Sequence, residues 1–519
     1  MIHIKKLIRL ACISSIMTLA VNNTQAQFCG GMGTIQNPFI ICNPQQLDSV
    51  RFFLDSNFIL ANDIDLEQYI NDNYPLDGWL PIGDDNTSFT GTLNGAGHKI
   101  TGLWIDRSTK VYVGLFGYTY NRAIIDSLGV EIDNLKGGII GESSVGGLIG
   151  EATTGTTIKN CYVIGNVNGA GYGGIGGLVG FAGRTTIKNC YATGNISGDD
   201  AVGGLVGTAG GTSSIIQSYA TGNVNGKTEI GGLVVETSAT VNIEDCYATG
   251  NVSGTNIVGG LVGVQFNPLT NCYAIGYVTG TGSSVGGLVG QNSGLITNCF
   301  FDSTTTKQKK GIGNVVGSGS GIVTALSTAE MFQDTAFINT GWDFTVGTGV
   351  WKICKGVNYP NLQWQDIHCN YTVTFIGENV NISPQNVEEG NLVIRPEDPI
   401  KEGYDFVGWF TDSGTFANEW DFATYIITSD TTLFAKWIEI TSITEIENIK
   451  VKIYPNPVKD VLYIGLSSGE KLDYSICDIL GQVVTFGTLK GDATINVETL
   501  ANGLYFLKIA GKTVKIIKN

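Results

Sequence analysis

A short run of glycines and aliphatic residues recurs along the middle of the chain at a nearly constant interval. The string Gly-Gly-Leu-Val-Gly, or a near copy, occurs six times, and its leucines are 27 to 30 residues apart. A second signature, seen as Asn-Cys-Tyr-Ala-Thr-Gly-Asn at residues 189–195, follows each copy in recognisable form. Self-similarity at a fixed period of this size indicates a repeat architecture. The repeated leucines are Leu148, Leu178, Leu205, Leu233, Leu261 and Leu288.

The residues of the unit predict strands. Gly, Thr and Val stand where helical arrays of similar period need Ala, Leu and Glu. The unit lacks the Leu-x-x-Leu-x-Leu pattern of leucine-rich repeats and is shorter than the roughly 40 residues of a propeller blade. A few short strands cannot bury an apolar face alone, so the units must stack. We therefore predict an all-β chain dominated by a right-handed parallel β-helix, with equivalent residues about 4.8 Å apart.

Glycine and asparagine have separate predicted places in the coil. The repeated glycines should lie at corners where φ is positive or where two backbones approach closely. The repeated asparagines should lie at turns, where they tolerate left-handed geometry and can bond to neighbouring coils. Val235 replaces the last glycine of one copy, which puts the geometry of that corner in doubt.

Alternation along Cys-Tyr-Ala-Thr places two columns on opposite faces of the strand. Cysteine is the more often buried type, so we predict an internal thiol ladder, with Ser218 filling one rung. The outward column is aromatic and ends at Phe300. If exposed, it could stack on sugar rings or hold a protein partner, whereas the alternative is packing under loops. The thiols are Cys161, Cys190, Cys246, Cys272 and Cys299, and the candidate binding residues are Tyr162, Tyr191, Tyr219, Tyr247 and Tyr273.

Charge and hydropathy narrow the possible partners. The formal net charge is −16, with 30 basic and 46 acidic residues, so we predict no nucleic-acid partner. A basic segment, an apolar stretch and Ala26 predict a signal peptide at residues 1–26. No other stretch reaches the ~18–20 apolar residues that a transmembrane helix needs.

The remaining cysteines and the ionisable residues offer little chemistry. Cys29 with Cys42, and Cys354 with Cys369, are close pairs that an oxidising compartment could bridge. Beyond the signal, the only histidines are His98 and His368, and we predict no catalytic residues, metal site or cofactor. Four acidic residues could hold calcium or flank a glycosidic bond, although a solvated turn is the interpretation we favour. They are Asp63, Asp65, Asp84 and Asp85.

The repeats resemble GLUG motifs, which occur in bacterial surface adhesins and cell-surface proteases. Gly114-Leu115-Phe116-Gly117 is a divergent early copy, and the segment from Trp342 to Leu362 resembles the C-terminal cap of that family. The resemblance covers residues 27–365 with their capping coils and implies a β-helix at the cell surface.

Two further modules follow in the sequence. Residues 371–437, with Gly403-Tyr404-Asp405-Phe406 and Ala435-Lys436-Trp437, resemble the β-grasp-like Listeria–Bacteroides repeat of internalin-type proteins. After a linker at 438–448, residues 449–519 resemble a type IX secretion C-terminal sorting domain and suggest a small β-sandwich. The second resemblance implies export by the type IX machinery of a Bacteroidetes-type bacterium. It also implies removal of the domain and attachment of the remainder to the outer surface.

We predict from these features a secreted, surface-anchored adhesin that binds glycans or extracellular proteins through its β-helix face. One alternative is a polysaccharide-active enzyme, a lyase or glycosidase. Scarce charge in the repeats counts against it. Another is a passive stalk or coat protein of about twelve coils, counted at roughly 28 residues per coil and 4.8 Å per rung.

Overall fold

The computed structural model describes residues 28–236, 240–439, 451–466, 469 and 471–519. The predicted signal peptide and nearly all of the predicted linker lie outside these residues. Contacts divide the chain into two compact units. The first holds residues up to 373 with segments 385–393 and 423–431, and the second holds the rest.

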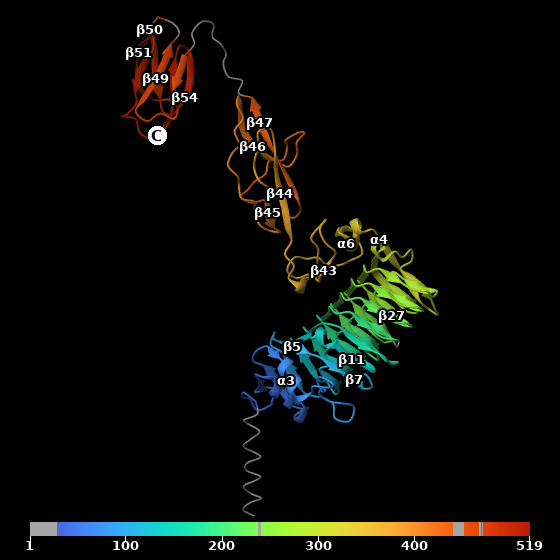
Figure 1. Ribbon diagram of the computed structural model, residues 1–519. Helices are drawn as coiled ribbons and strands as arrows, with labels where there is room; N and C mark the ends of the chain where they lie inside the picture. Colours follow the sequence, from blue (N-terminus) through green and yellow to red (C-terminus); the bar gives the residue numbers. More distant parts are fainter. Residues whose placement is uncertain (1–27, 237–239, 440–450, 467–468, 470) are drawn as a thin grey trace, which may run out of the picture. The chain divides into compact units, whose positions relative to one another are not determined.

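The first unit is a parallel β-solenoid, as the repeat predicted (Figure 1). Each coil contributes short strands to stacked parallel sheets, which contain seven, seven and eight strands on three faces, and a further sheet carries the tyrosines. The seven-stranded sheets run from β6 (Ile105–Asp106) to β36 (Val278–Thr279) and from β7 (Val111–Val113) to β37 (Ser284–Gly286). The eight-stranded sheet runs from β8 (Phe116–Thr119) to β40 (Ile312–Val315).

The solenoid has fewer coils than the twelve predicted, because helices, loops and a cap take up much of both ends of residues 28–364. Residues before the first complete coil form α2 (Pro44–Ser49), η1 (Val50–Phe52) and α3 (Glu67–Asn73). Residues after the last coil fold back as a cap with short helices: α4 (Ser303–Thr306), α5 (Thr328–Met331) and α6 (Thr335–Ile338). A capping box between Ser327 and Glu330 starts α5.

Aliphatic ladders fill the solenoid. All six repeat leucines are fully buried, and the five predicted thiols are 0–1% exposed. Ser218, also buried, fills the missing rung, so the internal thiol ladder is confirmed. The left-handed corners belong to the Asn column, where φ is about +50° from Asn160 to Asn298.

The repeated glycines are required for close approach between coils. A Cβ at Gly222 would lie 1.7 Å from the carbonyl oxygen of Gly194, and one at Gly204 would lie 2.1 Å from that of Gly232. Only glycine fits such contacts. At Val235, the register between β23 (Val206–Gly210) and β28 (Val234–Glu236) shifts, which is the local change that this substitution predicted.

Two antiparallel modules follow. The first is a four-stranded sheet in the order β45 (Gln385–Glu388), β44 (Asn370–Ile376), β47 (Thr431–Glu439) and β46 (Tyr404–Phe410). The second packs two sheets around a core that includes Leu462, Ile476 and Leu507. Its strands are β48 (Val451–Tyr454), β49 (Val461–Leu466) and β52 (Ala493–Asn496) in one sheet, and β51 (Val483–Lys490), β50 (Lys471–Cys477), β53 (Gly503–Ile509) and β54 (Lys512–Lys518) in the other.

Candidate functional site

The predicted tyrosine column forms a continuous stack on the outer face of the solenoid, the tyrosine ladder. Each ring comes from the same position of a short strand, and the in-register pairing of these strands aligns the rings. Neighbouring ring centroids are 4.8–5.0 Å apart, with planes within 9° of each other. The face of each ring is therefore covered by the next ring, and the ladder presents ring edges and hydroxyl groups to its surroundings. The strands are β15 (Tyr162–Ile164), β20 (Tyr191–Ala192), β25 (Tyr219–Ala220), β30 (Tyr247–Ala248) and β35 (Tyr273–Ala274).

The cap covers only the C-terminal part of the ladder. Tyr247 and Tyr273 are 3% and 1% exposed, whereas Tyr162, Tyr191 and Tyr219 remain partly exposed. The Tyr247 hydroxyl exchanges hydrogen bonds with the amide of the Gln365 side chain, and the Tyr273 hydroxyl donates to a cap carbonyl. The structure thus corrects the predicted stripe: its last two tyrosines are packed under a loop, and the stripe that solvent reaches is shorter.

Three tryptophans of the cap attach to the ladder in the same way. Each indole contacts aromatic rings of two successive coils, with centroids 5.6–6.3 Å apart. Each also donates its N–H to a residue of the left-handed corner column, over 2.9–3.3 Å. The pairs are Trp364 with the carbonyl of Gln217, Trp351 with the carboxylate of Asp245, and Trp342 with the carbonyl of Asn298.

Side-chain amides link the corner column from coil to coil. The amide of Asn189 donates to Asn160 over 3.2 Å, and that of Asn298 donates to Asn271 over 3.3 Å. Gln217 interrupts this chain, and the Oδ1 of Asn189 is buried without a hydrogen bond in the described part of the chain. The left-handed backbone geometry therefore runs through the whole corner column, whereas the chain of side-chain hydrogen bonds is interrupted at Gln217.

The N-terminal end of the ladder is open and polar. Tyr162 is in register with Gly129, and Gly129 with Lys99, so one outward column continues past the tyrosines. A Cβ at Gly129 would lie 2.3 Å from Cζ of Tyr162, which shows that the tyrosine ring leans over this glycine. Lys99 forms a 2.9 Å ion pair with Glu131. The open end thus combines ring edges with a donor and an acceptor.

Burial raises the pKa of every tyrosine of the ladder. It raises the pKa of Tyr162 and Tyr191, raises that of Tyr219 to about 12, and raises those of the two covered tyrosines as well. The cause is loss of water around the phenolate that would form. At the open end, the Glu131 hydrogen bond raises the pKa of Lys99.

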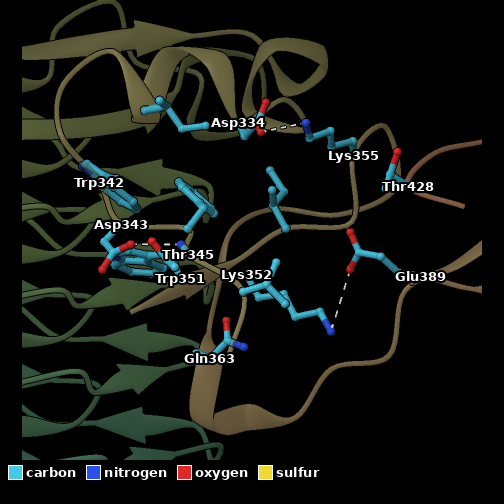
Figure 2. A pocket seen from close by; sticks show the side chains of 14 residues that line it. Asp334, Trp342, Asp343, Thr345, Trp351, Lys352, Lys355, Gln363, Glu389 and Thr428 are labelled. Carbon is cyan, nitrogen blue, oxygen red and sulfur yellow. Dashed lines mark hydrogen bonds and ion pairs between the residues drawn. The ribbon is translucent and has the colours of Figure 1, made fainter. Parts of the chain in front are cut away.

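A cavity of about 470 Å³ lies in the cap beside the buried Trp342 and Trp351 (Figure 2). Its charged groups already have partners. Lys355 pairs with Asp334 at 2.8 Å, and Lys352 lies 3.9 Å from Glu389. The indoles are committed to the ladder, so we do not assign a ligand to this cavity.

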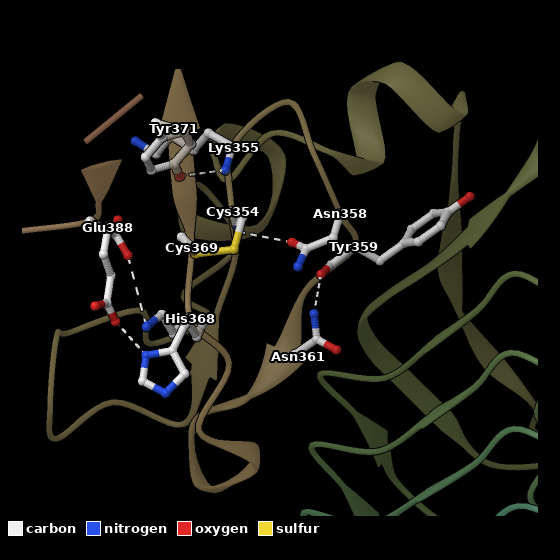
Figure 3. The surroundings of a disulfide bond; sticks show 11 residues. Cys354, Lys355, Asn358, Tyr359, Asn361, His368, Cys369, Tyr371 and Glu388 are labelled. Carbon is white, nitrogen blue, oxygen red and sulfur yellow. Dashed lines mark hydrogen bonds and ion pairs between the residues drawn. A yellow bond between two sulfur atoms is a disulfide. The ribbon is translucent and has the colours of Figure 1, made fainter. Parts of the chain in front are cut away.

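Both close cysteine pairs form disulfides, Cys29–Cys42 and Cys354–Cys369, with Cα atoms 6.2 and 5.2 Å apart. Around the second, the main-chain N–H of Cys354 donates to the side chain of Asn358 over 2.8 Å (Figure 3).

The predicted ionisable candidates lie in separate places. His368 is exposed and pairs with Glu388, and His98 lies 3.2 Å from Asp63. Asp84 accepts from the N–H groups of its own turn, and Asp65 accepts from that of Glu67. Asp85 is exposed and accepts from the side chain of Asn86. Within the described ranges, no three His, Cys, Asp or Glu side chains come together as a metal site.

The sequence did not reveal how the cap attaches. Its three tryptophans have no common spacing, and Trp364 donates its N–H to a residue 147 positions away. The sequence did contain one clue to this attachment, the column of corner residues. Because these residues are left-handed in every repeat, some of their main-chain carbonyls can accept a hydrogen bond from an indole N–H.

Sequence models of three protein families match the chain. The GLUG motif matches residues 137–168, 171–197, 198–225 and 281–306. The Listeria-Bacteroides repeat domain matches 371–436, and the secretion system C-terminal sorting domain matches 452–519. The sorting domain indicates a secreted, cell-surface protein and interaction with the type IX secretion machinery. In the described residues, no helix has the length and apolar character to cross a bilayer.

Individual relatives match over short stretches. A “Putative Gly-rich membrane protein” of Evansella cellulosilytica is 41% identical over 108 residues, 20% of this chain and 12% of the relative. Halomucin of Haloquadratum walsbyi is 31% identical over 162 residues, 29% of this chain and 2% of the relative. A solved structure, a “putative immunoglobulin A1 protease” from Bacteroides ovatus, aligns with a TM-score of 0.44 at 22% identity, over 65% of this chain and 96% of that one.

Proposed function

We propose that this GLUG-motif β-solenoid protein, secreted and displayed at the cell surface, is an adhesin that binds glycans through the open end of its tyrosine ladder. The observation that carries the proposal is the contrast along the ladder. The protein's own cap occupies the C-terminal rungs, while Tyr162 and Tyr191 leave equivalent positions accessible.

The cap supplies a template for the binding mode. Trp364 lies across Tyr191 and Tyr219 at 27–29° to their planes and donates its N–H to the carbonyl of Gln217. One coil earlier, the corresponding groups are Tyr162, Tyr191 and the carbonyl of Asn189. A ligand that lies across these two rungs needs an apolar surface and a donor at its rim. A sugar ring has both, because its C–H face is apolar and its hydroxyl groups donate.

The polar groups beside Tyr162 favour a sugar over a purely apolar ligand. Lys99 donates and Glu131 accepts, and each is partly exposed. No protein group bonds to the hydroxyls of Tyr162 or Tyr191 within the described residues, so both hydroxyls can bond to a ligand. Sites for small polar ligands commonly combine an aromatic surface with a few such groups.

The proposed role is recognition without catalysis. A glycosidase of the usual type needs two carboxyl groups about 5–10 Å apart across the scissile bond. At the open end, Glu131 is held by Lys99, and Asp63 accepts from His98 and from the main-chain N–H of Lys99. Both carboxylates serve as fixed hydrogen-bond acceptors in this proposal.

The test is binding of the secreted protein to an array of glycans and extracellular-matrix proteins. We expect saturable binding to one glycan class, and Tyr162→Ala should weaken it by about tenfold, the loss of one aromatic contact with its hydrogen bond. Tyr162→Ala removes the terminal ring of the stack and leaves the cap contacts in place.

Tyr172→Ala is the matched control, because this tyrosine is 92% exposed and lies outside the ladder. Equal binding by both variants and the native protein would refute the role of the ladder. Binding to matrix proteins alone would support an adhesin but would show that its ligand is a protein and not a glycan. Absence of binding to every member of the array would favour the alternative of a passive stalk or coat protein.

A further inference from the structure

The N-terminal coils contain a second cavity, of about 400 Å³, separate from the tyrosine ladder. This volume lies within the roughly 300–1,000 Å³ of small-molecule sites. Its walls come from η1, from the loop that contains Leu80 and Asp84, and from the segment between Arg107 and Val113. Three separate segments of the chain therefore meet around it.

Two arginines of the wall are held rigidly. Arg51 donates to the carbonyls of Leu80 and Pro81 over 2.8 and 3.2 Å, and Arg107 donates to those of Gly78 and Trp79 over 3.1 Å each. Both side chains are only 14% exposed. Both arginines also bond to a carboxylate: Asp48 accepts from Nε and Nη2 of Arg51, and Asp77 accepts from Nη1 of Arg107. Of the five N–H donors of each guanidinium, one is left on Arg51 and two are left on Arg107. Donors therefore remain on both arginines.

Three basic residues and one acidic residue line the cavity. Lys110 is its third basic residue, is exposed, and forms no ion pair with any described residue. The one acidic residue of the wall, Asp84, is engaged by Asn86 and Thr87 of its own turn. Asp48 and Asp77 do not line the cavity, but Asp48 pairs with Arg51 and Asp77 lies 3.4 Å from Arg107, so the charges of both arginines are offset. The group that faces the cavity without a partner is the ammonium of Lys110.

The rest of the wall is apolar and accessible. Phe52 is 72% exposed, Val111 46% and Leu80 40%. Tyr112 adopts a left-handed φ of +60°, which is a rare conformation for a bulky residue. Its ring packs edge-on against Tyr118, with centroids 5.2 Å apart. The in-register residue of the next coil, Ser144, has a left-handed φ of +49° as well, so this conformation belongs to a corner of the solenoid.

We propose that this cavity binds a carboxylated sugar unit of an acidic polysaccharide. The carboxylate accepts from the ammonium of Lys110 and from the N–H groups that remain free on Arg51 and Arg107. The apolar face of the sugar lies against Phe52 and Tyr112. The cavity therefore gives the adhesin a second site, whose ligand differs in charge from the one proposed for the ladder.

The test uses the secreted protein with polygalacturonate as the probe, dextran as the neutral polymer and heparin as the sulfated one. We expect saturable binding of polygalacturonate that weakens with salt, and none of dextran. Lys110→Glu should weaken polygalacturonate binding by at least tenfold, the effect of losing one charge-assisted hydrogen bond. Phe52→Ala should weaken it by several-fold.

Lys309→Glu, at an exposed lysine in the cap region, is the control for the change in net charge and should bind as the native protein does. Absence of polygalacturonate binding, or equal loss in both lysine variants, would overturn the assignment. Binding of heparin alone would overturn it as well. If Tyr162→Ala abolishes binding and Lys110→Glu leaves it intact, the acidic polymer belongs to the ladder and the cavity assignment fails.

Discussion

The two halves of the tyrosine ladder share one sequence signature and differ in what lies over them. Tyr247 and Tyr273 are buried under the cap, whereas Tyr162 and Tyr191 stay accessible on the same face. The rings of all four stack with the same spacing, so the repeat by itself does not distinguish a packing surface from a binding surface. The difference comes from a non-repetitive segment whose Trp364 reaches Tyr191 and stops one coil short of the N-terminal rung, Tyr162.

The largest expected effect is on the covered half. Trp351→Ala removes a fully buried indole that touches Tyr247 and Tyr273, and we expect the free energy of unfolding to fall by about 3–5 kcal/mol. Tyr162→Ala, on the open half, should cost much less because its ring is partly exposed. Denaturant unfolding of both variants measures the contrast, and equal losses would show that the cap adds no stability to the ladder.

The next largest expected effect is that the two halves of the ladder ionise at different alkaline pH. Burial raises the pKa of folded Tyr219 to about 12, against about 10 in an unfolded chain. The unfolded state therefore loses this proton first, and stability that is complete below about pH 10 declines as the pH rises toward 12. Ultraviolet titration should show the open tyrosines ionising before Tyr219, and the covered ones only as the protein unfolds. Tyr219→Phe should reduce the alkaline loss of stability; an unchanged pH profile would contradict the assignment.

A single hydroxyl should matter only under the cap. Tyr247→Phe removes the hydroxyl that bonds to the half-buried amide of Gln365 and should cost about 1 kcal/mol. Tyr191→Phe removes a hydroxyl with no protein hydrogen bond in the described residues and should change stability by less than about 0.5 kcal/mol. Thermal unfolding of the pair is the measurement. A loss at Tyr191 as large as that at Tyr247 would mean that both halves are packed alike.

The smallest expected effect is a gain at the corner where the two halves meet. Gln217→Asn should place an amide donor on the buried Oδ1 of Asn189, as Asn189 itself does for Asn160. Asparagine also tolerates the left-handed φ of +49° at this position. We expect a gain of about 0.5–1 kcal/mol in unfolding free energy. Gln217→Asp has a similar shape but cannot donate, and a gain of the same size in that variant would refute the hydrogen-bond explanation.

The parts of the fold that the sequence predicted are those that repeat. The thiol ladder, the buried leucines and the left-handed asparagines follow from the in-register stacking of equivalent residues, because one rung fixes the environment of the next. The prediction of twelve coils was too high, since it assumed that residues 28–91 and 303–364 also stack. Those segments contribute some stacked parallel strands, such as β1 (Phe39–Ile41), β2 (Asn57–Leu60) and β40, but otherwise form helices, loops and the cap.

The sequence by itself determined the solenoid, the two C-terminal modules and the alignment of the tyrosines, all of which depend on local periodicity or on contiguous motifs. Only the tertiary structure decided which tyrosines a ligand can reach, because the docking of Trp351 and Trp364 joins residues more than 100 positions apart. The cavity of the N-terminal coils has the same origin. Arg51 lies far along the chain from the segment that contains Arg107 and Lys110, and no spacing in the sequence marks these residues until folding brings the two segments together.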